Sequence, residues 1–335
     1  MKVLFDHPTP FLLAHGGFQI QIERTQAALQ SVGVQVEPLR WWDPDQKADL
    51  IQFFGRPLTS YVGFAHAKGM KIVLAELMTG TGSRTPSQLR LQKLMIRFTR
   101  RFAPQSMTFR LGWDSYRQAD AMVALTGWER QLMIDLFDAS PDRVHVVPNG
   151  VEEVFLRATP PSTRGPWLVC TAVITERKRV LELTEAAAHA KTPLWILGKA
   201  YGEDDPYSRR FLELVQKHPE VIRFEGPVQD REKLAQIYRE ARGFVLLSTM
   251  ESLSLSALEA AACGCPLLLS DLPWARTSFK DQARYCPVHA GTHRTAEILR
   301  AFYDAAPHIA PPERPQSWDA IAAQLKSVYQ SCLNT

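Results

Sequence analysis

The chain has few cysteines and no long apolar run, and each shortage excludes a class of protein. Its 335 residues include five cysteines, an odd number at irregular spacing, which is typical of reduced thiols rather than of a disulfide framework. No stretch approaches the ~20 apolar residues of a membrane span, and the opening MKVLFDHPTP lacks the apolar core of a signal peptide. We therefore expect a cytoplasmic protein.

Excess charge of one sign and metal-binding patterns are scarce as well. The net charge of +4 is too mild to indicate a nucleic-acid partner. Cys286, His289 and His293 have a metal-like spacing, but a fourth ligand is not apparent. Asp43 and Asp45 form an Asp-x-Asp pattern that reads as a turn in a loop. The sequence thus predicts no nucleic acid, no metal and no cofactor.

What the sequence does contain is a regular alternation of apolar, strand-length runs with amphipathic helical stretches. The strand candidates include KVLF, DLIQFF, KIVLAEL and AMVALT in the first half and WLVCTAV, PLWILG, GFVLLS and CPLLLS in the second. This alternation predicts the α/β class, with parallel sheets covered by helices on both faces. A chain of this length also suggests two domains.

A proline-rich segment, ATPPSTRGP at 158–166, separates the two halves. We predict a first domain over 1–157 and a second domain over 164–315. A final amphipathic helix within 316–335 is expected to cross back to the first domain. The predicted fold is two Rossmann-like, doubly wound domains that face a cleft, and such sheets bind ligands beyond the carboxyl ends of their strands.

The segment ESLSLSALEAAACGCP carries two carboxylates, Glu251 and Glu259, eight positions apart. Ser254 or Ser256 can cap a helix that ends at Gly264, and the free amides of such a helix attract a diphosphate. Carboxylates accept hydrogen bonds from vicinal hydroxyls, so a sugar is the natural ligand. In the alternative interpretation, Ser256 and Glu259 form only a capping box.

The longer run ESLSLSALEAAACGCPLLLSD resembles the Glu-x7-Glu motif of retaining glycosyltransferases with the two-Rossmann-domain (GT-B) architecture, especially family 4 and its group 1 domain. ADAMVALTGWERQLMIDLFDASPDRVHVVPNGVEEVF is similar to the end of that family's first domain, and TERKRVLELTEAA to its phosphate-binding lysine segment. The resemblance covers 115–285 well and the first 75 residues by pattern only.

The resemblance implies a retaining, metal-independent transferase with an N-terminal, acceptor-side domain over 1–157 and a nucleotide-sugar-binding domain over 164–315. Such an enzyme moves a sugar from a UDP-, GDP- or ADP-sugar to a glycan, lipid-linked or small-molecule acceptor. Lys178 would contact the donor diphosphate, Glu259 the ribose hydroxyls and Glu251 the transferred sugar. The backbone amides of Ser254 and Leu255 would meet the phosphate. Reaction on the front face would need no enzyme nucleophile, so Glu251 would orient the sugar.

Gly16 and Gly17 match the Gly-Gly loop of the same family, where missing side chains allow close backbone approach to substrate. A simple turn is the alternative. In KIVLAELMTGTGSR, where the family often has a histidine that faces the donor, this chain has none. Glu76 or the glycine-containing loop is left in that neighbourhood.

Two departures fall in the second half. Val173 stands where the family usually has an arginine, although Arg177 could supply a cation, and Ser254 stands where a glycine is common. Two alternative functions therefore stay open: a catalytically degenerate protein of the same fold that binds a nucleotide-sugar or glycan, and a nucleotide-sugar epimerase or sugar-phosphate synthase.

The segment 84–110 is basic and amphipathic. No acidic residue lies between Glu76 and Asp114, while cations gather around an apolar stripe. The cations are Arg84, Arg90, Lys93, Arg97, Arg100, Arg101 and Arg110, and the stripe is Leu91, Leu94, Met95, Phe98 and Phe102. Such a helix can lie on an anionic membrane. Alternatively, the stripe packs on the first domain while the cations are solvated or meet an acidic acceptor.

Overall fold

The computed structural model describes residues 1–8, 11, 16–157, 163–200 and 204–334, so part of the predicted 158–166 linker lies outside the described residues. It divides the chain into two compact units. Unit 1 holds Met1–Gly150 with Trp318–Thr335, and unit 2 holds Val151–Ser317. Unit 1 thus ends at Gly150, where 157 was predicted, and unit 2 spans Val151–Ser317, where 164–315 was predicted.

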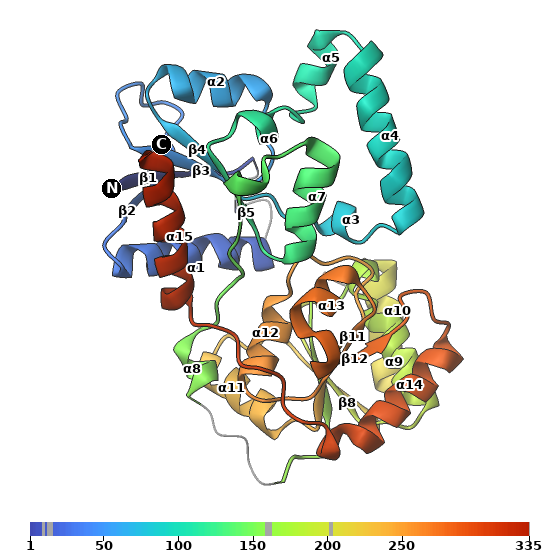
Figure 1. Cartoon of the computed structure of the whole chain (residues 1–335). Coiled ribbons are helices and arrows are strands. Elements are labelled where there is room, and N and C mark those ends of the chain that lie inside the picture. Colours follow the sequence, from blue (N-terminus) through green and yellow to red (C-terminus); the bar gives the residue numbers. More distant parts are fainter. Residues whose placement is uncertain (9–10, 12–15, 158–162, 201–203, 335) are drawn as a thin grey trace. The chain divides into compact units, whose positions relative to one another are not determined.

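Unit 1 is built on a six-stranded sheet in the order β2-β1-β3-β4-β5-β6 with every pairing parallel (Figure 1). Its strands are β1 (Lys2–Asp6), β2 (Gln35–Pro38), β3 (Leu50–Phe53), β4 (Lys71–Leu74), β5 (Ala121–Ala124) and β6 (Val144–Val146). Its helices are α1 (Gly17–Ser31), α2 (Thr59–Ala67), α3 (Thr79–Gly82), α4 (Pro86–Phe102), α5 (Gln105–Arg110), α6 (Ser115–Gln118), α7 (Gly127–Phe137), η1 (Pro141–Arg143) and α15 (Trp318–Leu333).

Helix α15 completes unit 1 although it is last in the chain. Its apolar side chains recur at helical spacing, and Ile321, Leu325 and Val328 are buried. The helix packs against α1, and the hydroxyl of Tyr329 donates a hydrogen bond to the side chain of Gln52 on β3. The expected return of the C-terminal helix to the first half of the chain is confirmed.

Unit 2 repeats the plan with the parallel order β12-β11-β10-β7-β8-β9. Its strands are β7 (Leu168–Thr171), β8 (Leu194–Leu197), β9 (Ile222–Glu225), β10 (Gly243–Leu246), β11 (Leu267–Ser270) and β12 (Arg284–Cys286). Its helices are α8 (Glu153–Leu156), η2 (Glu176–Lys178), α9 (Val180–His189), α10 (Pro206–Lys217), α11 (Arg231–Glu240), α12 (Leu255–Ala262), α13 (Pro273–Phe279), η3 (Lys280–Gln282), α14 (Thr292–Ala305) and η4 (Ala306–His308).

The inner strands of both sheets are largely apolar because helices cover both of their faces. All residues of β5, β10 and β11 are buried, as expected for central parallel strands. The predicted α/β class, with two doubly wound sheets, is confirmed. Within the described residues, no helix is both long enough and apolar enough to cross a membrane.

Candidate functional site

The strand order of unit 2 places a crevice between β7 and β10. From β7 the chain proceeds to β8 and β9 on one side, whereas from β10 it proceeds to β11 and β12 on the other. The loops that leave these two adjacent strands therefore diverge. In open α/β sheets this topological switch point is where ligands bind. Of the residues predicted to contact the donor, Arg177, Lys178 and Glu251 lie on these two loops, and Ser254, Leu255 and Glu259 belong to the helix that follows the second loop and its N-cap.

The loop after β7 holds Arg177 and Lys178 in a tight turn. The hydroxyl of Thr175 accepts a hydrogen bond from the amide of Lys178, which caps the short helix η2. Arg179 follows with a φ of 52°, a left-handed conformation that is costly for a residue with a Cβ. Its side chain compensates by donating to the carbonyls of Val288 and Ala290. The turn is thus fixed by contacts on both sides.

The loop after β10 carries Glu251, whose side chain meets that turn. The Nζ of Lys178 and, at 3.3 Å, the Nη1 of Arg177 both donate to its Oε1 atom. The hydroxyl of Ser248 donates to the same oxygen at 2.9 Å. Glu251 is only 9% exposed, and burying a carboxylate this deeply costs free energy unless charged partners compensate it. The two cations supply that compensation.

The backbone also joins the two loops. The amide of Thr249 donates to the carbonyl of Arg177 at 2.8 Å, and Nη1 of Arg177 donates to the carbonyl of Met250 at 2.9 Å. Sequence analysis named Arg177 and Lys178 only as contacts for the diphosphate. The structure adds that both bind Glu251, a pairing that spacing along the chain cannot reveal.

Helix α12 begins four residues after Glu251. Ser254 is its N-cap, because its hydroxyl accepts a hydrogen bond from the amide of Ala257, and Leu255 is the first helical residue. Gly264 follows the helix in the left-handed conformation, with a φ of 67°. The predicted helix with its glycine stop is confirmed. The positive end of its dipole lies at the switch point, where it favours an anion.

The capping-box alternative for Ser256 and Glu259 is wrong. Ser256 lies inside the helix, and the position three residues after the Ser254 cap is Ala257. The methyl group of alanine cannot return the second hydrogen bond that a capping box requires. Glu259 is instead paired with a residue from another helix.

Glu259 belongs to a second charged cluster in unit 2. It is 8% exposed, and the Nη2 of Arg231 donates to its Oε1 atom. The Nε of Arg231 donates to Glu152 at 2.9 Å, and its guanidinium lies over the ring of Phe155 at 4.7 Å. Burial disfavours the charged guanidinium, but the Glu259 and Glu152 carboxylates together outweigh it and raise the pKa of Arg231. The guanidinium therefore stays charged.

Sequence analysis missed Arg231 and Glu152. One signal was available: Arg231 is the first residue of α11, after the Asp230 cap. A cation in the first turn is unfavourable to the helix dipole, so an arginine there indicates an acidic partner. Glu152 follows the PNGV segment directly, but no local pattern links it to Arg231.

In unit 1, Gly16 and Gly17 lie at the start of α1, in the loop that leaves β1. Gly16 is the N-cap, with a φ of 152° that disfavours a side chain, and Gly17 is the first helical residue. A Cβ added at either position meets nothing within 4 Å. The backbone conformation of Gly16 favours glycine. At both positions there is room for a side chain, so steric crowding does not explain either glycine. Residues 12–15, which complete the loop, lie outside the described residues.

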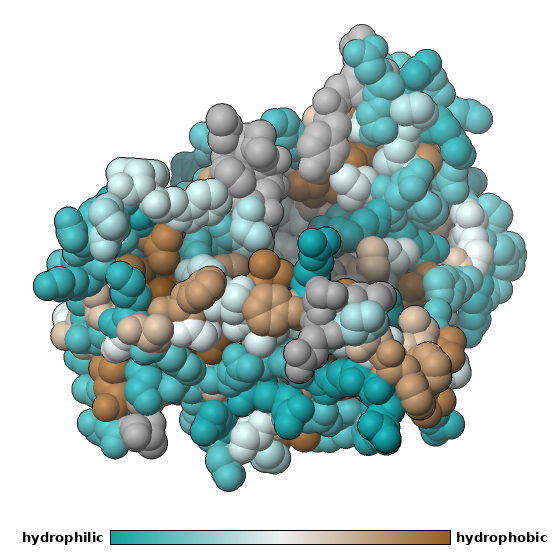
Figure 2. Space-filling view, turned by 90° about the horizontal axis from the view of Figure 1, so that it is seen from above, coloured by the Kyte–Doolittle hydropathy of each residue, from teal (hydrophilic) through white to brown (hydrophobic). Residues whose placement is uncertain are grey.

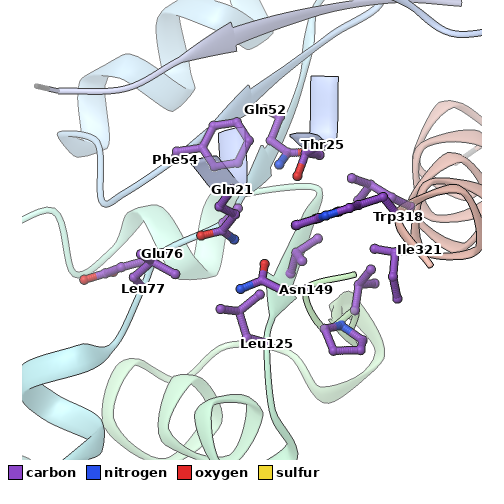
Figure 3. Close-up of a pocket in the computed structure, with 15 residues that line it drawn as sticks. Gln21, Thr25, Gln52, Phe54, Glu76, Leu77, Leu125, Asn149, Trp318 and Ile321 are labelled. Carbon is purple, nitrogen blue, oxygen red and sulfur yellow. The ribbon is translucent and has the colours of Figure 1, made fainter. Parts of the chain in front are cut away.

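Unit 1 also contains a narrow cavity beyond the carboxyl ends of β3 to β6 (Figure 3). The side chains of Gln21 from α1 and Asn149 point into it, and Trp318 of α15 forms part of its wall. Glu76 follows β4 at the same edge, but its carboxylate points away from these amides (Figure 3).

Glu76 is the residue that sequence analysis left in place of the missing histidine, and the structure engages it in a cluster. Arg56 binds it through two hydrogen bonds of 3.0 and 2.9 Å, and the hydroxyl of Tyr116 donates to it. Burial, reinforced by the Glu76 charge, raises the pKa of Tyr116 well above its ordinary value. Tyr116 therefore stays neutral and acts as a donor.

Metal ligands do not gather in the described residues: no group of three His, Cys, Asp or Glu side chains there could hold an ion. Asp43 accepts a hydrogen bond from the amide of Asp45 at 3.1 Å and pairs with Arg40 at 2.7 Å. The Asp-x-Asp segment thus forms a local turn. His293 lies beside the ring of His189, 5.3 Å between centroids.

The chain is similar in sequence to known glycosyltransferases. Residues 165–304 match the family model "Glycosyl transferases group 1". The chain is 32% identical over 180 residues to the D-inositol 3-phosphate glycosyltransferase of Frankia alni, which covers 48% of this chain and 44% of that protein. The enzyme of the same name from Xylanimonas cellulosilytica is 30% identical over 241 residues, 63% and 57% of the two chains. The chain spans about half the length of these relatives.

Solved structures extend the likeness over the whole chain. Anabaena Alr3699/HepE in complex with UDP has a TM-score of 0.68 at 15% identity and covers 100% of this chain and 99% of its own. The sucrose-phosphate synthase of Thermosynechococcus elongatus has a TM-score of 0.64 at 16% identity, with 99% of each chain covered. The chain therefore has the GT-B fold, and residues 165–304, within unit 2, match the glycosyl transferases group 1 model.

Proposed function

We propose that the protein is a glycosyltransferase that moves a sugar from a nucleotide-diphosphate sugar to an acceptor. One observation carries the proposal: a single crevice brings together Lys178, Arg177 and Glu251 a few residues before the capped start of α12. Cations and helix amides suit a diphosphate, and a carboxylate suits sugar hydroxyls. The match of 165–304 to the group 1 family supports the same reading.

In this proposal the positive groups do the work of a metal ion. Charge develops on the leaving diphosphate as the glycosidic bond breaks, and Lys178, Arg177 and the amides of Ser254 and Leu255 are preorganised to stabilise it. Glu251 orients the transferred sugar, and Glu259 accepts hydrogen bonds from the ribose. The reaction proceeds on the front face and retains the anomeric configuration.

The Lys178–Glu251 ion pair gives the site a further property. A bound diphosphate competes with Glu251 for the ammonium group of Lys178. As the lysine turns toward the phosphate, the carboxylate gains free lone pairs for the sugar. Donor binding would in this way switch Glu251 from a partner of lysine to an acceptor for hydroxyls.

Unit 1 is proposed to bind the acceptor, a glycan, a lipid-linked glycan or a small molecule. Its cavity presents the amides of Gln21 and Asn149, which can both donate to and accept from hydroxyls. Relatives named for D-inositol 3-phosphate make a polyol phosphate one acceptor to test. For the donor, UDP-sugars come first, because a solved neighbour was obtained with UDP-glucose.

A thermal-shift panel of UDP, GDP, ADP and their sugars tests donor binding, since a ligand at ~100 times its Kd adds ~2.7 kcal/mol to stability. Incubation with labelled donors then tests the reaction: a transferase forms a new glycoside, an epimerase forms an epimer of the donor sugar, and a mere binder forms neither. Transfer should persist in a chelator. Activity that disappears there and returns with manganese or magnesium would contradict the metal-independent proposal.

A further inference from the structure

Helix α4 turns its most apolar face outward. Leu91, Leu94, Met95, Phe98 and Phe102 are between 59% and 68% exposed. They recur at helical spacing and form one stripe along the helix. In the space-filling view of one face of the molecule, hydrophobic side chains reach a mostly hydrophilic surface in separate groups (Figure 2). Five large apolar side chains exposed on one helix are a costly arrangement unless something covers them.

The opposite face of α4 fixes this orientation. Leu89 and Ile96 are buried in the core of unit 1. On the same side, Lys93 pairs with Asp135 at 3.5 Å and Arg100 pairs with Asp114 at 3.3 Å and with Asp138. The alternative in which the apolar stripe packs on the first domain is therefore wrong. Lys93 and Arg100 form ion pairs within unit 1 and do not belong to the outward-facing surface of the helix.

The remaining cations of the helix flank the stripe. At about 100° per residue, Arg90, Arg97 and Arg101 share one side of α4, next to the apolar face, and all three are exposed. Arg84 before the helix is also exposed, as are Phe109 and Arg110 at the end of α5. No acidic residue occurs anywhere in 77–113. The surface is thus apolar with a positive rim.

We propose that this face of α4 docks on an anionic lipid bilayer. The apolar stripe would enter the boundary between headgroups and acyl chains, and the three arginines would meet lipid phosphates, as in interfacial helices. A second copy of the chain fits less well, because a two-fold contact pairs this face with itself, and the face offers the arginines no acidic partner. The inference goes beyond the proposed function and does not depend on it.

Cosedimentation with vesicles tests the proposal. The full chain should bind phosphatidylglycerol vesicles at low salt, bind phosphatidylcholine vesicles much less, and lose binding as salt rises, because surface attraction is screened within ~8 Å at physiological ionic strength. The variant R90Q/R97Q/R101Q should bind about a hundredfold more weakly. L94S/F98S/F102S should also bind weakly although its charge is unchanged. Circular dichroism melting should show both variants folded as the parent.

The matched control is R284Q/R294Q/R300Q, which removes the same charge from exposed positions of unit 2. It should bind vesicles as the parent does. Equal loss in the control would reduce the effect to net charge and overturn the proposal. It would also be overturned by a parent that ignores phosphatidylglycerol, or by a lipid-free dimer that L94S/F98S/F102S dissociates, which would assign the face to a second copy. If R90Q/R97Q/R101Q still bound the vesicles as the parent does, the three arginines would not contact lipid phosphates and the proposal would be wrong.

Discussion

Lys178 and Glu251 are 73 positions apart in the chain, yet the lysine ammonium group donates directly to the glutamate carboxylate. Their side chains are mostly buried, 14% and 11% exposed. The pair joins the loops after β7 and β10 at the switch point of unit 2. Because each residue neutralises the other, a change in one alters both the charge and the freedom of its partner.

Glu251→Gln separates the two roles of this residue. The amide cannot neutralise Lys178 and Arg177, so both cations become more available to a diphosphate. We expect nucleotide binding to stay equal or tighten, while transfer to an acceptor falls by at least ~100-fold, the typical loss when an oriented polar group is removed from an active site. Calorimetric titration with UDP, GDP and ADP, beside product formation from labelled donor, gives both quantities. A parallel loss of binding and transfer would argue against an orienting role.

Lys178→Ala should act on the diphosphate rather than on the nucleoside. Loss of one charge-assisted contact is worth roughly 1.5 to 3 kcal/mol, or about 10- to 150-fold in Kd. The affinity for a nucleoside diphosphate should fall by that factor, and the affinity for the nucleoside should hardly change. Lys217→Ala, at an exposed position at the end of α10, is the control. Equal losses for both ligands would remove Lys178 from the phosphate site.

Glu259→Ala should weaken nucleotide binding by about 10- to 150-fold, because a carboxylate that accepts hydrogen bonds from hydroxyls is worth roughly 1.5 to 3 kcal/mol. Arg231, which pairs with Glu259, is expected to stabilise the fold of unit 2. Arg231→Gln leaves Glu259 and Glu152 without their shared cation, so we expect a lower melting temperature. Glu152→Gln keeps the Arg231–Glu259 pair and should cost less. If Arg231→Gln melts as the parent does, the cluster contributes nothing to the stability of unit 2.

Local patterns predicted the elements of this site better than its contacts. The helix after Glu251 could be placed from Ser254 and Gly264, because caps and stops are local chemistry. The cations that pair with Glu251 and Glu259 could not be, because they lie on segments that follow other strands, and strand order is a property of the whole sheet. The wrong capping box shows the same limit: a four-residue pattern fits any helix start, and only the observed start at Leu255 excludes it.

All five cysteines are buried, so the native protein should react slowly with a thiol reagent. Burial raises the pKa of Cys170, Cys263 and Cys265 to about 12 and that of Cys332 to about 11. The thiolate is the nucleophile, so at pH 8 almost none is present. A colorimetric thiol assay should find five groups only after denaturation. One fast thiol in the native state would reveal an opening of the core.

The same shift sets the sign of a pH effect on stability. A folded-state pKa above the unfolded value near 9 means that the native state holds its protons longer. The stabilisation is present below pH ~9 and declines as pH rises toward the folded values. Melting temperatures measured from pH 7 to pH 11 should therefore fall in the upper part of that range. A flat profile would contradict the burial of these thiols.

The last prediction concerns the backbone that supports the crevice. Gly198 follows β8, and a Cβ at this position would lie 1.8 Å from the carbonyl oxygen of Ala172, which follows β7. Real contacts never come so close, so Gly198→Ala must push the two loops apart at the carboxyl edge of the sheet. Overpacking of this kind costs about 1 to 3 kcal/mol. We expect a melting temperature several degrees lower and, if the displaced edge moves Lys178, weaker nucleotide binding.

Gly226→Ala is the matched control for this prediction. Gly226 follows β9 in the same sheet, and a Cβ there meets nothing within 4 Å. The same chemical change should therefore leave melting and nucleotide affinity near the parent values. The comparison holds the gain of a methyl group constant, so a difference between the two variants reports the contact with Ala172 alone. Equal melting temperatures would mean that the backbone of β7 and β8 yields freely and does not hold the Lys178 turn in place.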